Sequence, residues 1–259
     1  MVKEPDDTAI VVPTMGTRPE LLEMCVKSIR AAGCDIVHVV IPDPEKVAHL
    51  LESGQITKVV VDPGRGLAAA INAGVESLPQ SVVFANWLGD DDLITPGSIK
   101  IARAVLESDT RTSLAFGACE YINAAGDVIF RSRSGWWAPL LMYVGPQMVP
   151  QPGSLFRTAD FRAVGGLDTS YKFAFDLDLL MKLRRIGRFR YVKQTLSQFR
   201  WHSESLSVGG RGGSVVEASQ IRRRYLPPIA RQMSVLWEPV LRRATLWAGG
   251  RVTRRATGL

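Results

Sequence analysis

The sequence predicts an α/β fold with a mostly parallel sheet flanked by helices. Short runs of β-branched and other apolar residues alternate with helical patterns through the first half of the chain. These runs are nearly all apolar, which is typical of strands covered on both faces. Ligands bind such sheets beyond the carboxyl ends of the strands. The strands that we expect here cover residues 8–14, 35–41, 58–62 and 81–88.

Helices are expected between these strands. Residues 19–33 have Pro19 in the first turn and end in glycine, which are favoured start and stop positions. A second helix, rich in small residues, is expected over residues 67–77, and a third over 96–108, started by Pro96. The order of strands and helices therefore indicates repeated β-α units in the first half of the chain.

The second half shows a different pattern. Residues 112–132 read as a hairpin with its turn at 123–126. A short glycine-capped helix is expected at 158–167, an amphipathic helix at 176–187 and a strand at 188–193. We therefore divide the chain into a nucleotide-binding half, an acceptor-binding half and a helical tail, with the boundaries 1–110, 111–208 and 209–259.

Composition places the protein among globular chains that favour anionic partners. The 259 residues are 46% hydrophobic, enough for a large core, and carry a formal net charge of +7. The three cysteines are widely spaced and form no CxxC pair, so neither a zinc knuckle nor a disulfide framework is indicated. The N-terminus lacks a signal-peptide core, and the apolar stretch 136–150 is interrupted by prolines. We expect a cytoplasmic protein.

The tail is basic and interleaved with apolar residues. Nine arginines but only Glu217 and Glu238 as acids occur in residues 215–259. A basic amphipathic helix is typical of membrane surfaces. The alternative is a helix packed on the domain with a solvated arginine face. We expect a basic helical extension that holds the protein peripherally on the inner face of the cell membrane.

Three adjacent carboxylates end the fourth expected strand, in the segment LGDDDLITPG at residues 88–97. One interpretation is a solvated cap for the helix at Pro96. The other is a cation site, because Mg²⁺ and Mn²⁺ prefer oxygen ligands and take few of them from the protein. Asp90 and Asp92, at positions i and i+2, are then the candidate ligands.

Two later segments carry further candidate chemistry. Asp176 and Asp178 begin an otherwise apolar helix. Asp178 is the better candidate for a capping residue, favoured by the helix dipole, and the other carboxylate is a candidate general base. Trp201 and His202 follow the last expected strand, where a lone histidine is more often structural than a ligand.

A glycine pattern after the third strand offers a competing function. Gly64, Gly66 and Ala69 match G-x-G-x-x-A between a strand and a helix, as in dinucleotide phosphate turns. This would suggest an NAD(P)-dependent oxidoreductase. However, the pattern is not on the first strand, and Arg65 lies between the glycines. We therefore favour the interpretation that these glycines allow close helix–strand packing.

Taken in order, five segments resemble the family 2 glycosyltransferases of the GT-A fold, a Rossmann-like α/β fold. They are VVPTMGTRPELLEMCVKSI, GRGLAAAINAG, LGDDDLITPGSI, QPGSLFRTADFRAVGGLDTSYKFAFDLDLLMKL and FRWHSESLS. The resemblance covers roughly residues 8–207 and is closest to bacterial enzymes that build envelope polysaccharides and their lipid-linked precursors. It implies an inverting, metal-dependent transfer of sugar from a nucleotide-sugar donor to a hydroxyl of a glycan or lipid-linked acceptor.

The resemblance also implies a role for individual residues. Asp176 matches the catalytic base, although Phe175 replaces the glutamate that many relatives carry before it. Asp92 and Asp90 match the DxD metal ligands, and His202 lies where a histidine approaches the metal, Mg²⁺ or Mn²⁺. Gln151, Gly153 and Trp201 are implied on the acceptor side, Trp201 in a late motif near the donor diphosphate. The donor-binding residues would be Thr14, Arg18, Asp43, Arg65, Asn72, Asp90 and Asp91.

Three classes of function therefore remain to be compared: the glycosyltransferase, the NAD(P)-dependent oxidoreductase, and a non-enzymatic module that binds anionic surfaces through the arginine tail. We expect no nucleic-acid partner. The sequence does not indicate the donor sugar, the nucleotide base or the acceptor.

Overall fold

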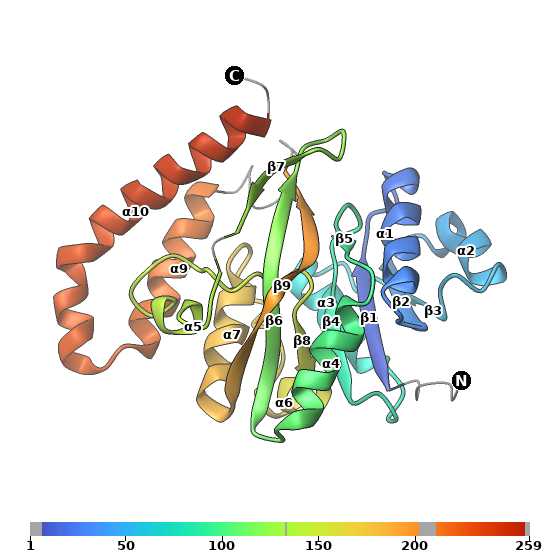
Figure 1. The fold of residues 1–259 in the computed structure, drawn as a ribbon, viewed down its shortest axis with the longest axis horizontal. Coiled ribbons are helices and arrows are strands. Elements are labelled where there is room, and N and C mark those ends of the chain that lie inside the picture. The colour runs from blue at the N-terminus through green and yellow to red at the C-terminus, as the bar shows by residue number, and fades with distance from the viewer. Residues whose placement is uncertain (1–6, 133, 202–210, 257–259) are drawn as a thin grey trace.

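The structure is a computed structural model that describes residues 7–132, 134–201 and 211–256. Within these residues, strands form a single sheet with helices on both faces (Figure 1). The first four strands lie close to the predicted positions, namely β1 (Thr8–Pro13), β2 (Ile36–Ile41), β3 (Lys58–Val61) and β4 (Phe84–Trp87). They pair in parallel in the order β3-β2-β1-β4, so their carboxyl ends share one edge.

The second half of the sheet is mixed, and the prediction of a mostly parallel sheet is wrong there. Its strands are β5 (Leu93–Ile94), β6 (Thr112–Ile122), β7 (Val128–Arg131), β8 (Leu155–Arg157) and β9 (Arg188–Arg200). The full order is β3-β2-β1-β4-β8-β6-β9-β5, with β7 on β6. Short β8 runs antiparallel between β4 and β6, and β5 runs antiparallel to β9. The β6–β7 hairpin lies where it was predicted.

Helices cover both faces of the sheet because the strands alternate their side chains. Ile10 and Val12 of β1 face a core formed with α1 (Pro19–Ala31). The neighbouring residues Ala9 and Val11 face the opposite core, with α3 (Leu67–Glu76) and α7 (Phe175–Ile186). The remaining helices before the tail are η1 (Pro44–Val47), α2 (Ala48–Glu52), α4 (Ser98–Ser108), α5 (Ala138–Leu141) and α6 (Thr158–Ala163).

Two predictions about helix starts need correction. Helix α4 begins at Ser98, after Gly97 with a left-handed φ of +73°, and Pro96 precedes it. Gly64 and Gly66 do not permit close packing: a Cβ on either would meet no atom within 4 Å, but both have positive φ, at +68° and +90°. They are needed to turn the chain from β3 into α3. The close approach occurs at Gly74, where a Cβ would lie 2.3 Å from Val11.

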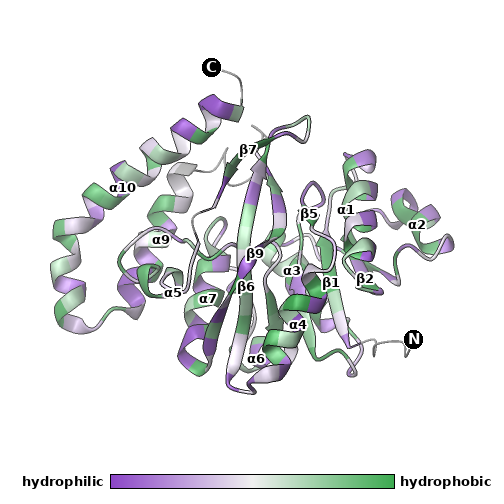
Figure 2. Cartoon of the chain, viewed as in Figure 1, coloured by the Kyte–Doolittle hydropathy of each residue, from purple (hydrophilic) through white to green (hydrophobic). Residues whose placement is uncertain are grey.

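The tail consists of two helices, α9 (Arg211–Tyr225) and α10 (Pro228–Ala256), which lie beside α7 and α5 at one end of the sheet (Figure 1). Helix α9 packs on the domain, since Ile221 is fully buried in the same core as α7. Helix α10 carries hydrophobic and hydrophilic residues interspersed along its length (Figure 2). No helix in the described parts of the chain is both long and apolar enough to cross a membrane.

Candidate active site

The three adjacent aspartates lie in the loop between β4 and β5, at the carboxyl edge of the parallel strands. They are not a solvated helix cap. Asp90 and Asp92 are only 5% and 4% exposed, and α4 has no side-chain cap. Three neighbouring carboxylates in a buried loop repel one another and lose hydration, so they need cationic or hydrogen-bonding partners. We refer to residues 89–92 as the acidic loop.

Two side chains from the end of β1 contact the acidic loop. The Thr14 hydroxyl donates to Asp90 Oδ2 at 2.5 Å. The Arg18 guanidinium forms ion pairs with two carboxylates: Nη2 lies 2.5 Å from Asp90 Oδ1, and Nη1 lies 2.7 Å from Asp91 Oδ2. The structure thus brings Thr14, Arg18, Asp90 and Asp91 together, which are four of the residues predicted for donor binding.

Arg200, at the end of β9, makes a second set of hydrogen bonds to the acidic loop. Its main-chain N–H donates to Asp92 Oδ1 at 2.9 Å, and its Nε donates to the carbonyl of Asp91 at 3.1 Å. Its Nη1 reaches the carbonyls of Asn123 and Ala124 in the β6–β7 turn. Arg200 is 3% exposed, so this guanidinium is a buried cation beside the acidic loop. Sequence reasoning gave it no role.

The electrostatics of the acidic loop suit a cation. Burial raises the pKa of Asp90, and burial together with the charge of Asp91 raises the pKa of Asp92 well above its usual value. A positive ion would stabilise the ionised forms. In the described residues, no group of three or more Asp, Glu, His or Cys side chains forms a complete metal site. This donor set suits Mg²⁺ or Mn²⁺, which take one or two carboxylates and complete their coordination with substrate phosphates and water. Asp92 and Asp90 are the residues that would hold it.

Asp176 lies in the first turn of α7 and is partly buried. Its Oδ2 accepts a hydrogen bond from Gln147 Nε2 at 2.9 Å, and its Oδ1 accepts from the N–H of Leu177 at 2.8 Å. Burial raises the pKa of Asp176, while the hydrogen bond from Gln147 opposes the rise. A carboxylate with a raised pKa at the start of a helix is suited to accept a proton.

The prediction that Asp178 caps this helix is wrong. The residue at the N-cap position is Ala174, and no side chain of α7 caps the helix. Asp178 is fully buried and pairs with Lys182 at 2.7 Å, one turn later. It also accepts a hydrogen bond from the Tyr225 hydroxyl at 3.1 Å. The pair with Lys182 forms because residues four apart on a helix lie on the same face. The hydrogen bond from Tyr225 joins α7 to α9.

One short segment connects the two acidic sites. Gln147 contacts Asp176, and four residues later Gln151 Nε2 donates to the carbonyl of Trp87 at 2.8 Å, just before the acidic loop. Four residues span at most about 14 Å. Gly153 follows with φ +74°, packed so tightly against Leu196 of β9 that a Cβ would lie 2.9 Å from its carbonyl carbon. Segment 147–153 thus forms a wall common to both sites.

Three other predicted donor residues are not in contact with the acidic loop in the bonds described. Asp43 follows β2 and caps η1 by accepting from the N–H of Glu45. Arg65 is exposed in the turn before α3. Asn72 makes a paired contact with Leu167, donating to its carbonyl and accepting from its N–H, both at 2.9 Å. Its amide therefore ties α3 to the loop after α6.

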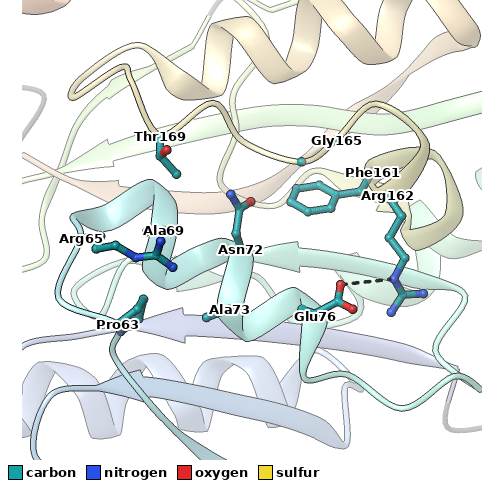
Figure 3. Close-up of a pocket in the computed structure, with 11 residues that line it drawn as sticks. Pro63, Arg65, Ala69, Asn72, Ala73, Glu76, Phe161, Arg162, Gly165 and Thr169 are labelled. Atoms are coloured by element: carbon teal, nitrogen blue, oxygen red, sulfur yellow. Dashed lines mark ion pairs between the residues drawn. The ribbon is translucent and has the colours of Figure 1, made fainter.

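Arg65 and Asn72 line a cavity of about 490 Å³ between α3 and the loop after α6 (Figure 3). Asn72 points toward the loop side, and Arg162 pairs with Glu76 at the far end, at 4.0 Å. The residues that line this cavity do not include the acidic loop or Asp176. The cavity is therefore distinct from the region that the acidic loop and Asp176 border.

Trp201 makes its described contacts with β6, β9 and α10, and none with Gln151 or Gly153 is among them. Its ring packs near Tyr121 and Phe199, with centroid distances of 5.7 and 6.2 Å. Its Nε1 donates to Thr253 Oγ1 of α10 at 3.2 Å. His202 lies outside the described residues. The residues that sequence reasoning missed are Arg200 and Gln147, whose contacts join segments 108 and 29 residues apart and leave no local pattern.

Comparison with solved structures identifies the fold. A scan against protein-family models and a search of curated protein sequences give no match. Among solved structures, the mannosyltransferase PcManGT from Pyrobaculum calidifontis, in complex with GDP-Man and Mn²⁺, is similar with a TM-score of 0.65 and 15% identity, over 97% of this chain and 75% of that one. S. aureus TarS 1–349 in complex with UDP gives 0.63 and 14%, over 88% and 69%.

GalNAc-T7 with UDP, GalNAc and Mn²⁺ is also similar, with a TM-score of 0.57 and 12% identity over 83% of this chain. The chain spans 47% of GalNAc-T7 and 42% of the longer TarS chain. These neighbours are glycosyltransferases of the GT-A type. At this level of identity the similarity concerns the fold alone, and the chain has the GT-A fold of these structures.

Proposed function

We propose that this protein is an inverting, metal-dependent glycosyltransferase that moves a sugar from a nucleoside-diphosphate sugar to a hydroxyl of a glycan or lipid-linked acceptor. The observation that carries this proposal is the shared wall. Segment 147–153 reaches Asp176 through Gln147, and through Gln151 it reaches the carbonyl of Trp87, two residues before the acidic loop. A carboxylate cluster suited to a cation and a carboxylate suited to accept a proton therefore border one region of a GT-A fold.

On the donor side, Asp92 and Asp90 would hold Mg²⁺ or Mn²⁺. When bound, the cation neutralises the charge that develops on the departing diphosphate. The chain's own residues prepare this site: Thr14 and Arg18 orient Asp90, and the N–H of Arg200 orients Asp92. Arg65, exposed at the start of α3, supplies further positive charge near the donor.

On the acceptor side, Asp176 takes the proton from the attacking hydroxyl. Its raised pKa makes it a better base than an exposed aspartate. Gln147 donates to Oδ2, which holds the carboxylate in one orientation. The hydroxyl oxygen then forms the new bond as the bond to the diphosphate breaks, and the anomeric centre is inverted in this single displacement.

Residues 136–147, in the half of the chain that we predict to bind the acceptor, include exposed apolar side chains. Trp136 is 75% exposed, and Leu140 in α5 is 57% exposed. Gln147, the partner of Asp176, follows a few residues later. An apolar lip at the acceptor side fits a lipid-linked acceptor better than a free sugar, which is the envelope-type role implied by the sequence.

We further propose that α10 binds an anionic membrane surface. Five of its exposed apolar side chains recur at helical spacing and form one stripe, with Val235 exposed beside it: Ile229, Met233, Leu236, Val240 and Trp247, each more than half exposed. Glu238, about a third of the way along the helix, is buried on the opposite face against Arg222 of α9. Residues 215–259 carry nine arginines and two glutamates, a surplus of seven, which equals the net charge of the whole chain. Apolar insertion and attraction to anionic lipid would therefore act together.

This membrane proposal is tested with substitutions on the stripe, because α9 is part of the core and truncating the tail would remove it. A Leu236→Ser, Trp247→Ser double variant should partition about tenfold less into phosphatidylglycerol vesicles in a sedimentation assay. Val61→Ser, which replaces an apolar side chain 63% exposed on edge strand β3, is the matched control. Equal sedimentation of the double variant and the wild type would refute the proposal.

The catalytic proposal is tested by thermal shift with a panel of nucleotide sugars, in Mn²⁺ or in EDTA. The cognate donor at about one hundred times its Kd should stabilise the protein by about 2.7 kcal/mol, or raise Tm by roughly 5–10 °C, in Mn²⁺ but not in EDTA. Asp92→Asn should abolish the shift, whereas Asp35→Asn, on an exposed loop, should not. Stabilisation by NAD(P)H that is indifferent to EDTA would instead support the oxidoreductase.

A further inference from the structure

A carboxylate of the C-terminal helices reaches the start of α7. Glu217 of α9 accepts hydrogen bonds from three consecutive main-chain N–H groups. Oε1 accepts from Lys172 at 3.0 Å, and Oε2 accepts from Phe173 at 2.8 Å and from Ala174 at 2.9 Å. These three residues directly precede α7, and Asp176 is the second residue of that helix.

The contact holds the chain at the point where it enters the helix. The N-cap residue of α7, Ala174, has no side-chain cap hydrogen bond of its own, and its N–H, with those of the two residues before it, is satisfied from another helix. A carboxylate that accepts three N–H groups fixes the backbone of residues 172–174. It thereby fixes where α7 begins and the direction in which Asp176 leaves the backbone.

Helix α9 is itself firmly seated. A Cβ on Gly213 would lie 2.5 Å from the ring of Phe173, so α9 and the entrance of α7 pack closely there. Farther along the helix, the Tyr225 hydroxyl donates to Asp178 of α7. Glu217 is therefore presented by a helix held at both ends against α7.

The same helix also secures the partner of Asp176. Arg222 of α9, 4% exposed, pairs with Glu238 of α10 at 3.1 Å, and its Nη1 donates to the carbonyl of Gly145 at 3.3 Å. Gly145 lies two residues before Gln147, the donor to Asp176. Helix α9 thus contacts both the backbone that carries Asp176 and the segment that orients its carboxylate.

We infer that Glu217 is a positioning residue for the transfer reaction and that α9 is a support for the catalytic base. This inference rests on the proposed function, in which Asp176 removes the acceptor proton. It assigns the C-terminal helices a role in the chemistry that is separate from membrane binding.

The test compares Glu217→Gln with the wild type. A carboxamide has one acceptor oxygen and presents an NH₂ group in place of the other, so at least one N–H of residues 172–174 loses its partner. We expect kcat to fall about 10- to 100-fold, as is common when a catalytic group is displaced slightly. The donor KM should stay within about twofold, because α9 does not touch the acidic loop in the bonds described. Amides 172–174 should also exchange hydrogen faster.

Two further variants decide whether the effect runs through Asp176. Glu217→Asp keeps both acceptor oxygens on a shorter side chain, and its kcat should lie between those of the wild type and Glu217→Gln. The aspartate variant also provides the test if the glutamine variant folds poorly. In an Asp176→Asn background, Glu217→Gln should cause almost no additional loss of residual transfer. The control Glu52→Gln, exposed on α2, should have no effect.

The inference is overturned if Glu217→Gln keeps wild-type kcat while amides 172–174 exchange faster, or if its loss multiplies with that of Asp176→Asn. Those results leave the proposed function intact. Full transfer activity in Asp176→Asn alone would instead overturn the assignment of the base, and this inference with it.

Discussion

The two acidic sites of this protein are built in different ways. The acidic loop holds three carboxylates close together and is fastened by cations and hydroxyls from the two strand ends beside it: Thr14 and Arg18 after β1, and Arg200 at the end of β9. Asp176 is a single carboxylate whose side-chain partner is a neutral amide, Gln147, and whose helix start is fixed by α9.

This difference corresponds to two kinds of chemistry. A site for a cation needs concentrated negative charge, and the surrounding cations keep that charge tolerable in the folded protein. A base must give up hydration yet remain able to take a proton, so neutral partners and burial suit it better. The comparison teaches that the carboxylates of one fold acquire separate roles from their neighbours.

The largest stability effect is expected on the side of the acidic loop. Replacing Arg200 by Met removes a buried guanidinium and leaves the carbonyls of Asp91, Asn123 and Ala124 without that donor. We expect the free energy of unfolding to fall by about 3–5 kcal/mol in urea denaturation. Arg190→Met, on the exposed part of the same strand, should change it by less than about 1 kcal/mol. Equal losses of unfolding free energy for both variants would show that the buried contacts of Arg200 do not stabilise the folded protein.

The wall between the two sites is tested at Gly153. A Cβ there would require a left-handed residue and would lie 2.9 Å from the main chain of Leu196. Gly153→Ala should therefore cost about 2–4 kcal/mol of unfolding free energy. Gly126→Ala, with φ +97° but open space around it, should cost only about 1 kcal/mol. If the two variants lose the same stability, segment 147–153 is not tightly packed.

A third prediction concerns the neutral partner of the base. Gln147→Leu should lower kcat about tenfold, because it removes a hydrogen bond to an ionised carboxylate worth roughly 1.5–3 kcal/mol. That hydrogen bond lowers the pKa of Asp176. Its removal should raise the pKa and move the acidic limb of the kcat–pH profile to higher pH. A profile that does not move would indicate that Gln147 does not act on Asp176.

At neutral pH, the smallest effect is expected outside both sites, at His38 of β2. Burial, and to a lesser extent the charge of Lys58, lower the pKa of His38 to about 4. The unfolded chain therefore binds a proton near pH 6.5 and the folded chain does not. Stability is fully present above pH 6.5 and is lost as the pH falls toward 4, where the loss reaches about 3 kcal/mol.

His38→Gln should remove this part of the pH dependence in urea titrations between pH 7 and 4. The buried carboxylates with raised pKa values act in the opposite direction, since protonation favours their folded forms, so the difference between variant and wild type is the quantity to compare. A difference that is constant with pH would show that His38 is not held neutral.

The sequence predicts one of the two halves of the fold better than the other. Strands β1 to β4 are apolar runs between helices, and local pattern is enough to place them. Strand β8 is three residues long, and β9 mixes charged, polar and apolar residues over thirteen positions without a continuous apolar run. Their pairings depend on distant partners, so the antiparallel pairings of β8 with β4 and β6, and of β9 with β5, were not predicted.

The residues of the candidate site also fall into two groups, those that the local sequence pattern predicts and those that it does not. Asp90, Asp92 and Asp176 stand out because carboxylates are unusual beside apolar runs. Arg200, Gln147 and Glu217 carry no such signal, and their contacts span 108, 29 and 43–45 residues. A tertiary fold is required to bring each of them to its partner.

The measurement that tests the central claim most directly is a comparison of donor binding and transfer in Asp176→Asn. With the donor identified by thermal shift, calorimetry in Mn²⁺ should give the same Kd for this variant and the wild type, within about twofold. Transfer to the acceptor should fall about 100- to 10,000-fold, the usual contribution of a general base. Wild-type transfer, or a loss of donor affinity as large as the loss of transfer, would contradict the division of work between the two acidic sites.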